Sequence, residues 1–91
     1  MKVYDKAAWH IDNGENKDDV LKRFSIVFKY LAEKNMLTSE GREILDLGID
    51  SSVSLHERMV NSEGQKLLDS KYDTLLGLSI AELQKQLQVN L

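Results

Sequence analysis

The side chains that could do chemistry in this chain gather around its two histidines. His56, followed by Glu57, begins a segment that starts like the His-Glu-x-x-His motif of zinc proteases. The fifth position holds Val60, where the motif needs a second histidine on the same helix face. Residues 12–16 loosely resemble a calcium loop, but Gly14 stands where the third-position ligand belongs. We therefore expect no metal ion at either segment.

His56 also lies close in sequence to Asp50, Ser52 and Ser54, a mixture that could form a nucleophilic site. Such catalysis requires a base hydrogen-bonded to the nucleophile and a third group that orients the base. A polar loop ahead of a helix contains the same residue types, so we interpret the segment as a solvated capping loop. We expect no catalytic and no cofactor-binding residues in the chain.

A repeat marks the elements that must position these side chains. The eleven residues that begin at Met36 recur 23 residues later, beginning at Met59, and six of the eleven positions are identical. Each copy of this M-[LV]-[TN]-S-E-G phrase has an apolar lead-in, a capping side chain, an acid and a glycine ahead of an apolar pair. That order is typical of a helix start, so the repeat predicts two equivalent helix starts.

The first copy, residues 37–45, resembles the L-T-x-x-G-R-x-x-L phrase that opens the helix after the wing in winged-helix transcription regulators. The resemblance covers nine residues and implies DNA binding. In that family the phrase follows a β-hairpin wing and a basic recognition helix. Here it follows an amphipathic segment that contains Phe24 and Phe28, and it occurs twice.

The spacing of apolar residues predicts helices along the whole chain. The strongest spans about eighteen residues from the N-cap Asn16, with a core stripe of Val20, Phe24, Val27, Phe28 and Leu31. A short first helix is expected over residues 4–12, with Tyr4, Ala8 and Ile11 on its buried face. Residues 49–60 are expected to form a loop and a short helix.

Two further helices are predicted, one from the second copy of the phrase to Gly77 and one at the C-terminus. Ser79 and Glu82 form a capping box for the last helix, with Leu78 and Leu83 as its hydrophobic staple. Gly41 and Gly48 are expected on a buried stripe, where a missing side chain permits close approach.

No segment alternates apolar and polar residues as a strand does, so we predict no strands. The predicted fold is therefore all-α: one helical domain over residues 1–91, a small bundle of four main helices plus a short N-terminal helix, two of them opened by the repeated phrase.

Composition and charge restrict the class of function. The 91 residues include no cysteine and no apolar run long enough to cross a membrane, which favours a cytoplasmic protein without a membrane partner. Twelve scattered basic residues against fifteen acidic ones give a net charge of −3, which disfavours nucleic acid. Nine lysines against three arginines are typical of an AT-rich bacterial or phage genome.

Two surfaces are candidate partner contacts. Trp9, beside His10, lies about 100° from the expected buried face of the first helix. It either packs under residues 49–60, which we favour, or stays exposed as an interface anchor. The apolar side of the last helix either packs on its own bundle, which we favour, or forms a homodimer contact; its residues are Ile80, Leu83, Leu87 and Leu91.

These observations favour a non-enzymatic, acidic, cytoplasmic protein that binds another protein, for instance a regulator, an antitoxin or an immunity-type inhibitor. One alternative is a winged-helix-like DNA-binding regulator. Another is a small enzyme that uses His56 with Glu57, or His10 with Asp12, as its titratable groups.

Overall fold

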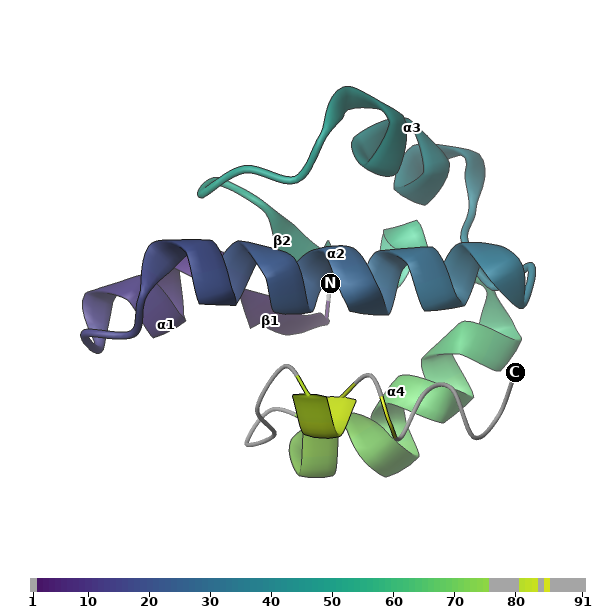
Figure 1. The fold of residues 1–91 in the computed structure, drawn as a ribbon. Coiled ribbons are helices and arrows are strands. Elements are labelled where there is room, and N and C mark those ends of the chain that lie inside the picture. The colour runs from purple at the N-terminus through teal and green to yellow at the C-terminus, as the bar shows by residue number, and fades with distance from the viewer. Residues whose placement is uncertain (1, 76–80, 84, 86–91) are drawn as a thin grey trace.

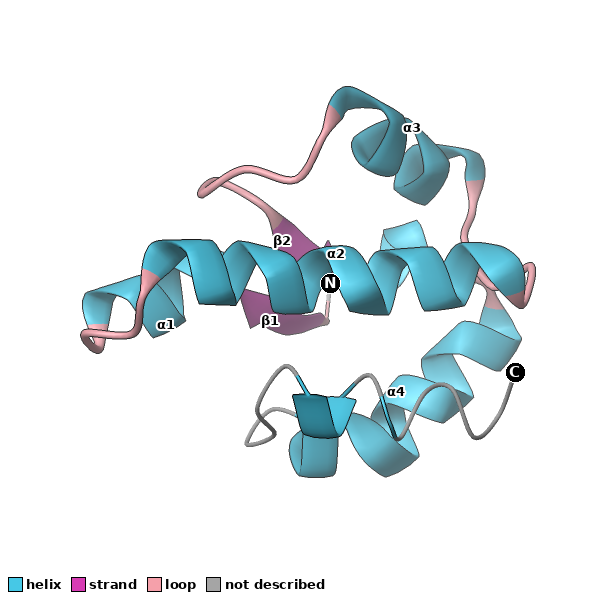
Figure 2. Cartoon of the chain, viewed as in Figure 1, coloured by secondary structure: helices cyan, strands magenta, loops and turns pink. Residues whose placement is uncertain are grey.

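The fold was determined as a computed structural model, which describes residues 2–75, 81–83 and 85 (Figure 1). Their elements in chain order are β1 (Val3–Lys6), α1 (Ala7–Asp12), α2 (Lys17–Glu33), α3 (Ser39–Leu47), β2 (Ser54–His56), the 3₁₀ turn η1 (Glu57–Met59) and α4 (Ser62–Leu75). The predicted all-α bundle is therefore wrong, because this mostly helical chain also contains a two-stranded antiparallel sheet (Figure 2).

The sheet joins the start of the chain to the segment that was expected to be a loop and a short helix. Asp5 pairs with Leu55 and Lys6 with Ser54, and the backbone N–H of Ala7 donates to the Val53 carbonyl at 3.1 Å. Each strand has at most four residues. Strands this short cannot show a recognisable alternation of polar and apolar positions. The pairing partners are also separated by residues 7–53, which a local pattern cannot reveal.

The strand changes which side of the first segment faces the core. Because α1 begins only at Ala7, that residue is fully buried and Ala8 is exposed, whereas the sequence predicted Ala8 on the buried face. Tyr4, expected on the same helical face, lies in β1. The expected helix over residues 4–12 is thus a strand as far as Lys6 and a helix from Ala7 onward.

The central helix α2 forms as predicted. The Asn16 side chain accepts a hydrogen bond from the backbone N–H of Asp19 at 3.1 Å, as an N-cap does. The whole predicted stripe of α2 is buried in the core. In Figure 1 the helix crosses the middle of the molecule, with α3 on one side and α4 on the other.

The two copies of the repeated phrase open α3 and α4, and their lead-ins pair with each other. Leu37 and Val60 form an isolated antiparallel bridge. The Thr38 N–H donates to the Met59 carbonyl at 2.9 Å, and the Asn61 N–H donates to the Met36 carbonyl at the same distance. Equivalent positions therefore make equivalent contacts, as if related by a local two-fold axis.

The capping side chains repeat this reciprocity. The Thr38 hydroxyl donates to the Arg58 carbonyl at 2.6 Å, and the Asn61 amide donates to the Asn35 carbonyl at 2.8 Å. Each also accepts the N–H of the glycine three residues later, at 3.3 and 3.0 Å respectively. Each capping side chain thus fixes its own helix start and holds the lead-in of the other.

The glycines of the phrase permit this close approach. A Cβ at Gly41 would overlap the Met59 carbonyl oxygen, and one at Gly64 would lie 3.1 Å from the Met36 carbonyl oxygen. Gly48 is different, because it is exposed and has open space around it. Its predicted place on a buried stripe is wrong; with φ of 102° it ends α3 in a conformation that L side chains rarely adopt.

Residues 49–60 contribute to the core mainly through Val53, Leu55, Met59 and Val60, all of which are buried. Leu55, in β2, is fully buried. Near the C-terminus, Leu83 is 2% exposed and belongs to the same core cluster. The predicted capping box and hydrophobic staple depend on Leu78 and Ser79, which lie outside the described residues.

Candidate functional site

Trp9 lies on the outer side of α1 and is 49% exposed. The helix starts at Ala7, which points into the core, so a residue two positions later points away from it. The favoured prediction that Trp9 packs under residues 49–60 is therefore wrong. The Lys6 ammonium group lies 5.7 Å from the centroid of the indole ring, within range of a cation–π interaction.

His10, the next residue, lies between two carboxylates. Its Nε2 is 2.8 Å from Asp5 Oδ2, and its Nδ1 is 2.6 Å from Glu15 Oε2. Glu15 is paired in turn with Arg23 on α2. The sequence suggested Asp12 as the acid beside His10, but the carboxylates that contact the ring are those of Asp5 and Glu15.

Asp5, Glu15 and Arg23 were missed by sequence reasoning. The five-residue spacing between Asp5 and His10 is not a helical spacing, and it brings the two side chains together only because the chain changes from strand to helix after Lys6. Asp5 is the buried charged residue of the described core, at 3% exposure. The one signal for this contact in the sequence was the position of the acidic residue Asp5 between Tyr4 and Ala7.

The electrostatics of this cluster favour a protonated His10. Burial lowers the pKa of His10, but the hydrogen bonds to Asp5 and Glu15 outweigh burial and leave the pKa raised above 6.5. Burial raises the pKa of Glu15, and the hydrogen bonds from His10 and Arg23 more than reverse this, so the pKa lies below 4.5. A protonated imidazole donates from both nitrogens, which matches a carboxylate on each side.

The cluster fixes the position of α1. It connects β1, α1, the turn before α2, and α2 itself, and the rings of His10 and Phe24 meet in a T-shaped arrangement with their centroids 6.2 Å apart. Lys6, at the N-cap of α1, provides no side-chain cap, so a six-residue helix depends on this network for its position. Trp9 is thereby presented on a fixed support.

His56 has a different environment. Its Nδ1 accepts the Arg58 backbone N–H at 3.3 Å, and its Nε2 is 3.9 Å from a carboxylate oxygen of Glu40 on α3. The acid that faces this ring is therefore Glu40 and not the adjacent Glu57 named by the sequence. The contact with Arg58 helps to start the 3₁₀ turn, which is a structural task.

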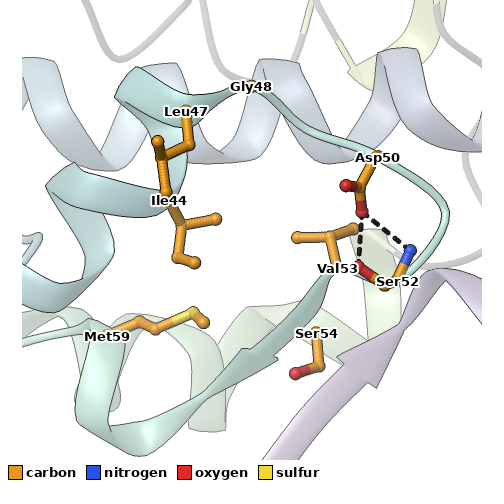
Figure 3. Close-up of a pocket in the computed structure, with 8 residues that line it drawn as sticks. All are labelled: Ile44, Leu47, Gly48, Asp50, Ser52, Val53, Ser54 and Met59. Atoms are coloured by element: carbon orange, nitrogen blue, oxygen red, sulfur yellow. Dashed lines mark hydrogen bonds between the residues drawn. The ribbon is translucent and has the colours of Figure 1, made fainter.

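The polar loop near His56 is organised by Asp50. Its carboxylate accepts the Ser52 backbone N–H at 2.9 Å and the Ser52 hydroxyl at 2.5 Å, and these bonds lower the pKa of Asp50. Both residues are exposed. The Ser52 hydroxyl donates to the Asp50 carboxylate two residues earlier and not to the His56 ring, and such a local contact closes a turn (Figure 3).

Among the residues that the structure describes, no group of three or more His, Cys, Asp or Glu side chains could hold a metal ion. None of the helices in that part of the chain combines the length and the apolar character that crossing a bilayer requires.

The C-terminal candidate residues are only partly covered. Leu83 is buried within its own chain, so its side chain is not presented to a partner. Ile80, Leu87 and Leu91 lie outside the described residues. The homodimer contact through the C-terminal helix therefore stays a prediction.

No family model, no curated protein and no solved structure matches this chain.

Proposed function

We propose that this chain is a non-enzymatic protein that acts by binding another protein, in the manner of a regulator, an antitoxin or an immunity-type inhibitor, in the bacterial cytoplasm. The observation that carries the proposal is the exposed indole of Trp9 on a helix held by the ion pairs of His10, one of which is to the buried Asp5. Tryptophan, like tyrosine and arginine, is enriched among the side chains that dominate binding energy.

The expected energy is large enough to matter. A fully covered tryptophan buries 150–250 Å², so covering the exposed half of Trp9 would remove roughly 100 Å² from water. At about 25 cal/mol per Å² this is worth roughly 2 to 3 kcal/mol. Because the ion pairs of His10 already hold α1, little ordering cost falls on the binding step.

The enzymatic alternative has less support. General base catalysis needs a ring nitrogen that can accept a proton from the substrate. Both nitrogens of His10 are hydrogen-bonded to carboxylates, and Nδ1 of His56 is used by the Arg58 backbone. Catalysis at either histidine would first have to break these contacts.

The DNA-binding alternative also has less support. A winged-helix wing is a hairpin of neighbouring strands, whereas β1 and β2 are separated by residues 7–53. The exposed helix that carries Trp9 is bordered by Asp12 and Glu15, and carboxylates repel phosphate.

The proposal is tested by affinity purification from the native host with the wild type, Trp9→Ala and the matched surface control Lys29→Ala. We expect the wild type and the control to recover the same partner, and Trp9→Ala to bind it about 30-fold more weakly, which corresponds to about 2 kcal/mol. Trp9 is the sole tryptophan of the chain, so its fluorescence should shift to the blue when the purified partner is added.

Circular dichroism and thermal melting must first show that Trp9→Ala folds like the wild type. Equal recovery of the partner by Trp9→Ala and the wild type would contradict the proposed anchor. An unchanged emission maximum in the presence of a bound partner would contradict it as well.

A further inference from the structure

The helix that presents Trp9 has few contacts of its own. α1 has six residues and lies beside the start of α2, at one end of the molecule (Figure 1). Ala7 is its buried residue, and no side-chain cap starts the helix. A helix this short is not stable alone in water. Its position therefore depends on His10, the side chain that connects it to both neighbouring elements.

His10 makes this connection through both ring nitrogens. Nε2 is 2.8 Å from the Asp5 carboxylate of β1, and Nδ1 is 2.6 Å from the Glu15 carboxylate in the turn before α2. From α2, Arg23 pairs with Glu15, and the Phe24 ring meets the imidazole edge to face. The charged groups that β1, the turn and α2 contribute to this cluster are therefore two carboxylates and one guanidinium.

The protonated ring can satisfy both carboxylates, whereas the neutral ring cannot. An imidazolium donates from both nitrogens, but a neutral imidazole has one N–H donor and one lone pair. An unpaired buried carboxylate is costly, so the remaining hydrogen stays on Nε2 and faces the buried Asp5. The Nδ1 lone pair then points at Glu15, and the two acceptors repel each other. The Glu15 side chain is 39% exposed and still paired with Arg23, so it can turn toward solvent.

The ring loses its proton at a pH that cells can reach. An ordinary histidine titrates near pH 6.5. Burial lowers the pKa of His10, but the hydrogen bonds to Asp5 and Glu15 raise it above that value. The pKa of Glu15 is lowered, so its carboxylate stays ionised while the ring titrates. The repulsion between Nδ1 and Glu15 therefore appears as the pH rises past 6.5.

The turn that Glu15 occupies also closes α1. The Gly14 N–H donates to the Ile11 carbonyl at 3.0 Å, and the Glu15 N–H donates to the His10 carbonyl at 3.1 Å. When the ring no longer holds Glu15, these bonds stay exposed at the end of a six-residue helix, and such ends open first. Trp9 lies one residue before His10, so opening of this end removes the fixed support of the indole.

We infer that His10 is a proton-dependent switch for α1. The protonated ring holds the helix and its exposed indole in place for a partner, and loss of the proton frees the C-terminal half of α1 and weakens binding. The weakening follows because the partner must then order the helix again, which costs free energy. The effect on binding rests on the proposed function, whereas the change in α1 is measured without a partner.

The test is an NMR pH titration of the isotope-labelled full chain between about pH 5.5 and 8.5. The ring resonances of His10 give its midpoint, and those of His56 give a comparison within the same sample. The order parameters of the Gly14 and Glu15 amides should fall from about 0.85 to below about 0.6 as the pH rises through the His10 midpoint. The order parameter of Phe28, in the core of α2, should stay at about 0.85.

Three variants identify the groups responsible. Glu15→Gln keeps the size of the side chain and removes its charge, so it should lower the His10 midpoint by about 1 pH unit. Glu33→Gln, the same charge change at an exposed position on α2, should move it by less than about 0.2 pH unit. His10→Gln should abolish the pH dependence of the order parameters.

Three results would overturn the switch. The first is a set of order parameters that does not change across the His10 midpoint, because other contacts would then hold α1. The second is a transition that persists in His10→Gln or follows the midpoint of His56. The third is an equal shift of the midpoint by Glu15→Gln and Glu33→Gln, because net charge alone would then act on the ring.

The partner recovered with Trp9 extends the test to binding. Its affinity for the wild type should fall about ten-fold between about pH 6 and 8.5, and this pH dependence should disappear in His10→Gln. An equal pH dependence in both proteins would contradict the control of binding by His10. Equal recovery of the partner by Trp9→Ala would contradict the proposed function, but the order parameters would still decide whether His10 controls α1.

Discussion

At the scale of single residues, the buried Asp5 determines the role of His10. A carboxylate at 3% exposure needs a charged partner, and the ring of His10 provides it at 2.8 Å. Glu15 lies on the other side of the ring and is itself paired with Arg23, so that negative and positive groups alternate along the cluster. The histidine is therefore part of the scaffold that holds α1.

This arrangement predicts a pH dependence for the stability that His10 contributes. The pKa of His10 is raised in the folded state, so its contribution is complete below 6.5 and is lost as the pH rises through the folded-state pKa. The pKa of Glu15 is lowered, so its contribution is complete above 4.5 and is lost as the pH falls through its folded-state pKa. The cluster should therefore stabilise the fold most between about pH 4.5 and 6.5.

The measurement is the free energy of unfolding of the wild type and His10→Gln from pH 3 to 9. We expect the free energy of unfolding of the wild type to exceed that of the variant most between pH 4.5 and 6.5. The difference should shrink on both sides of this range. Glu15→Gln serves as the control, because it removes the part of the pH dependence below pH 4.5 that is due to Glu15. A difference that grows as the pH rises above neutrality would contradict the protonated state assigned to His10.

At the scale of elements, the two helix starts depend on each other. The lead-in of α3 is held by residues 58–61, and the lead-in of α4 is held by residues 35–38. A helix-start signal is local, because the cap, the acid and the glycine all act within one turn. The sequence therefore predicted both starts, but it contained no sign that they would meet.

Gly41→Ala should reveal this dependence, because we expect it to lower the free energy of unfolding and not to raise it. Replacing glycine by alanine inside a helix normally stabilises it by about 1 kcal/mol. Here the new methyl group would overlap the Met59 carbonyl oxygen, and we expect a loss of about 1 to 3 kcal/mol. Gly64→Ala should cost less, because its nearest atoms, the Val60 Cβ at 2.9 Å and the Met36 carbonyl oxygen at 3.1 Å, lie farther from the new methyl group than the Met59 carbonyl oxygen does at Gly41.

Urea denaturation of the two variants measures both effects. The helix starts would be independent of each other if Gly41→Ala raised the free energy of unfolding, and the packing role of Gly41 would then be wrong. A larger loss for Gly64→Ala than for Gly41→Ala would contradict the order given by the two contacts.

The elements that sequence reasoning missed are those that depend on distant residues. The stripe of α2 repeats within the helix itself and was predicted in full. β1 becomes a strand only because β2 lies beside it, and the same pairing sets the point where α1 begins and thus exposes Trp9. The Asp5–His10 contact follows from that change of conformation, so it could not be predicted before the sheet was known.

At the scale of the whole molecule, one core includes side chains from helices, strand and turn. Leu55 of β2 is fully buried in the same cluster as Phe28 and Leu31 of α2. The short sheet therefore adds packing as well as hydrogen bonds. An all-α bundle would have assigned the core to helices alone.

Leu55→Ala should consequently destabilise the protein by about 2 to 5 kcal/mol, as expected when a fully buried leucine is truncated. Leu47→Ala, the same change at a side chain that is 77% exposed, should cost less than about 0.5 kcal/mol. Thermal and chemical unfolding of the two variants provides the comparison. Similar losses for both would mean that β2 does not anchor the core.

The reciprocal pairing of the two lead-ins also constrains how the chain matures during translation. The lead-in of α3 takes its long-range hydrogen-bond partners from residues 58–61, so these contacts cannot form until the ribosome has synthesised the second copy. At typical synthesis rates of about 5 to 20 residues per second, the 23-residue offset between the two copies corresponds to an interval of about 1 to 5 s. During that interval the apolar stripe of α2 lacks the core side chains that come later in the chain, among them Met59, Val60 and Leu68.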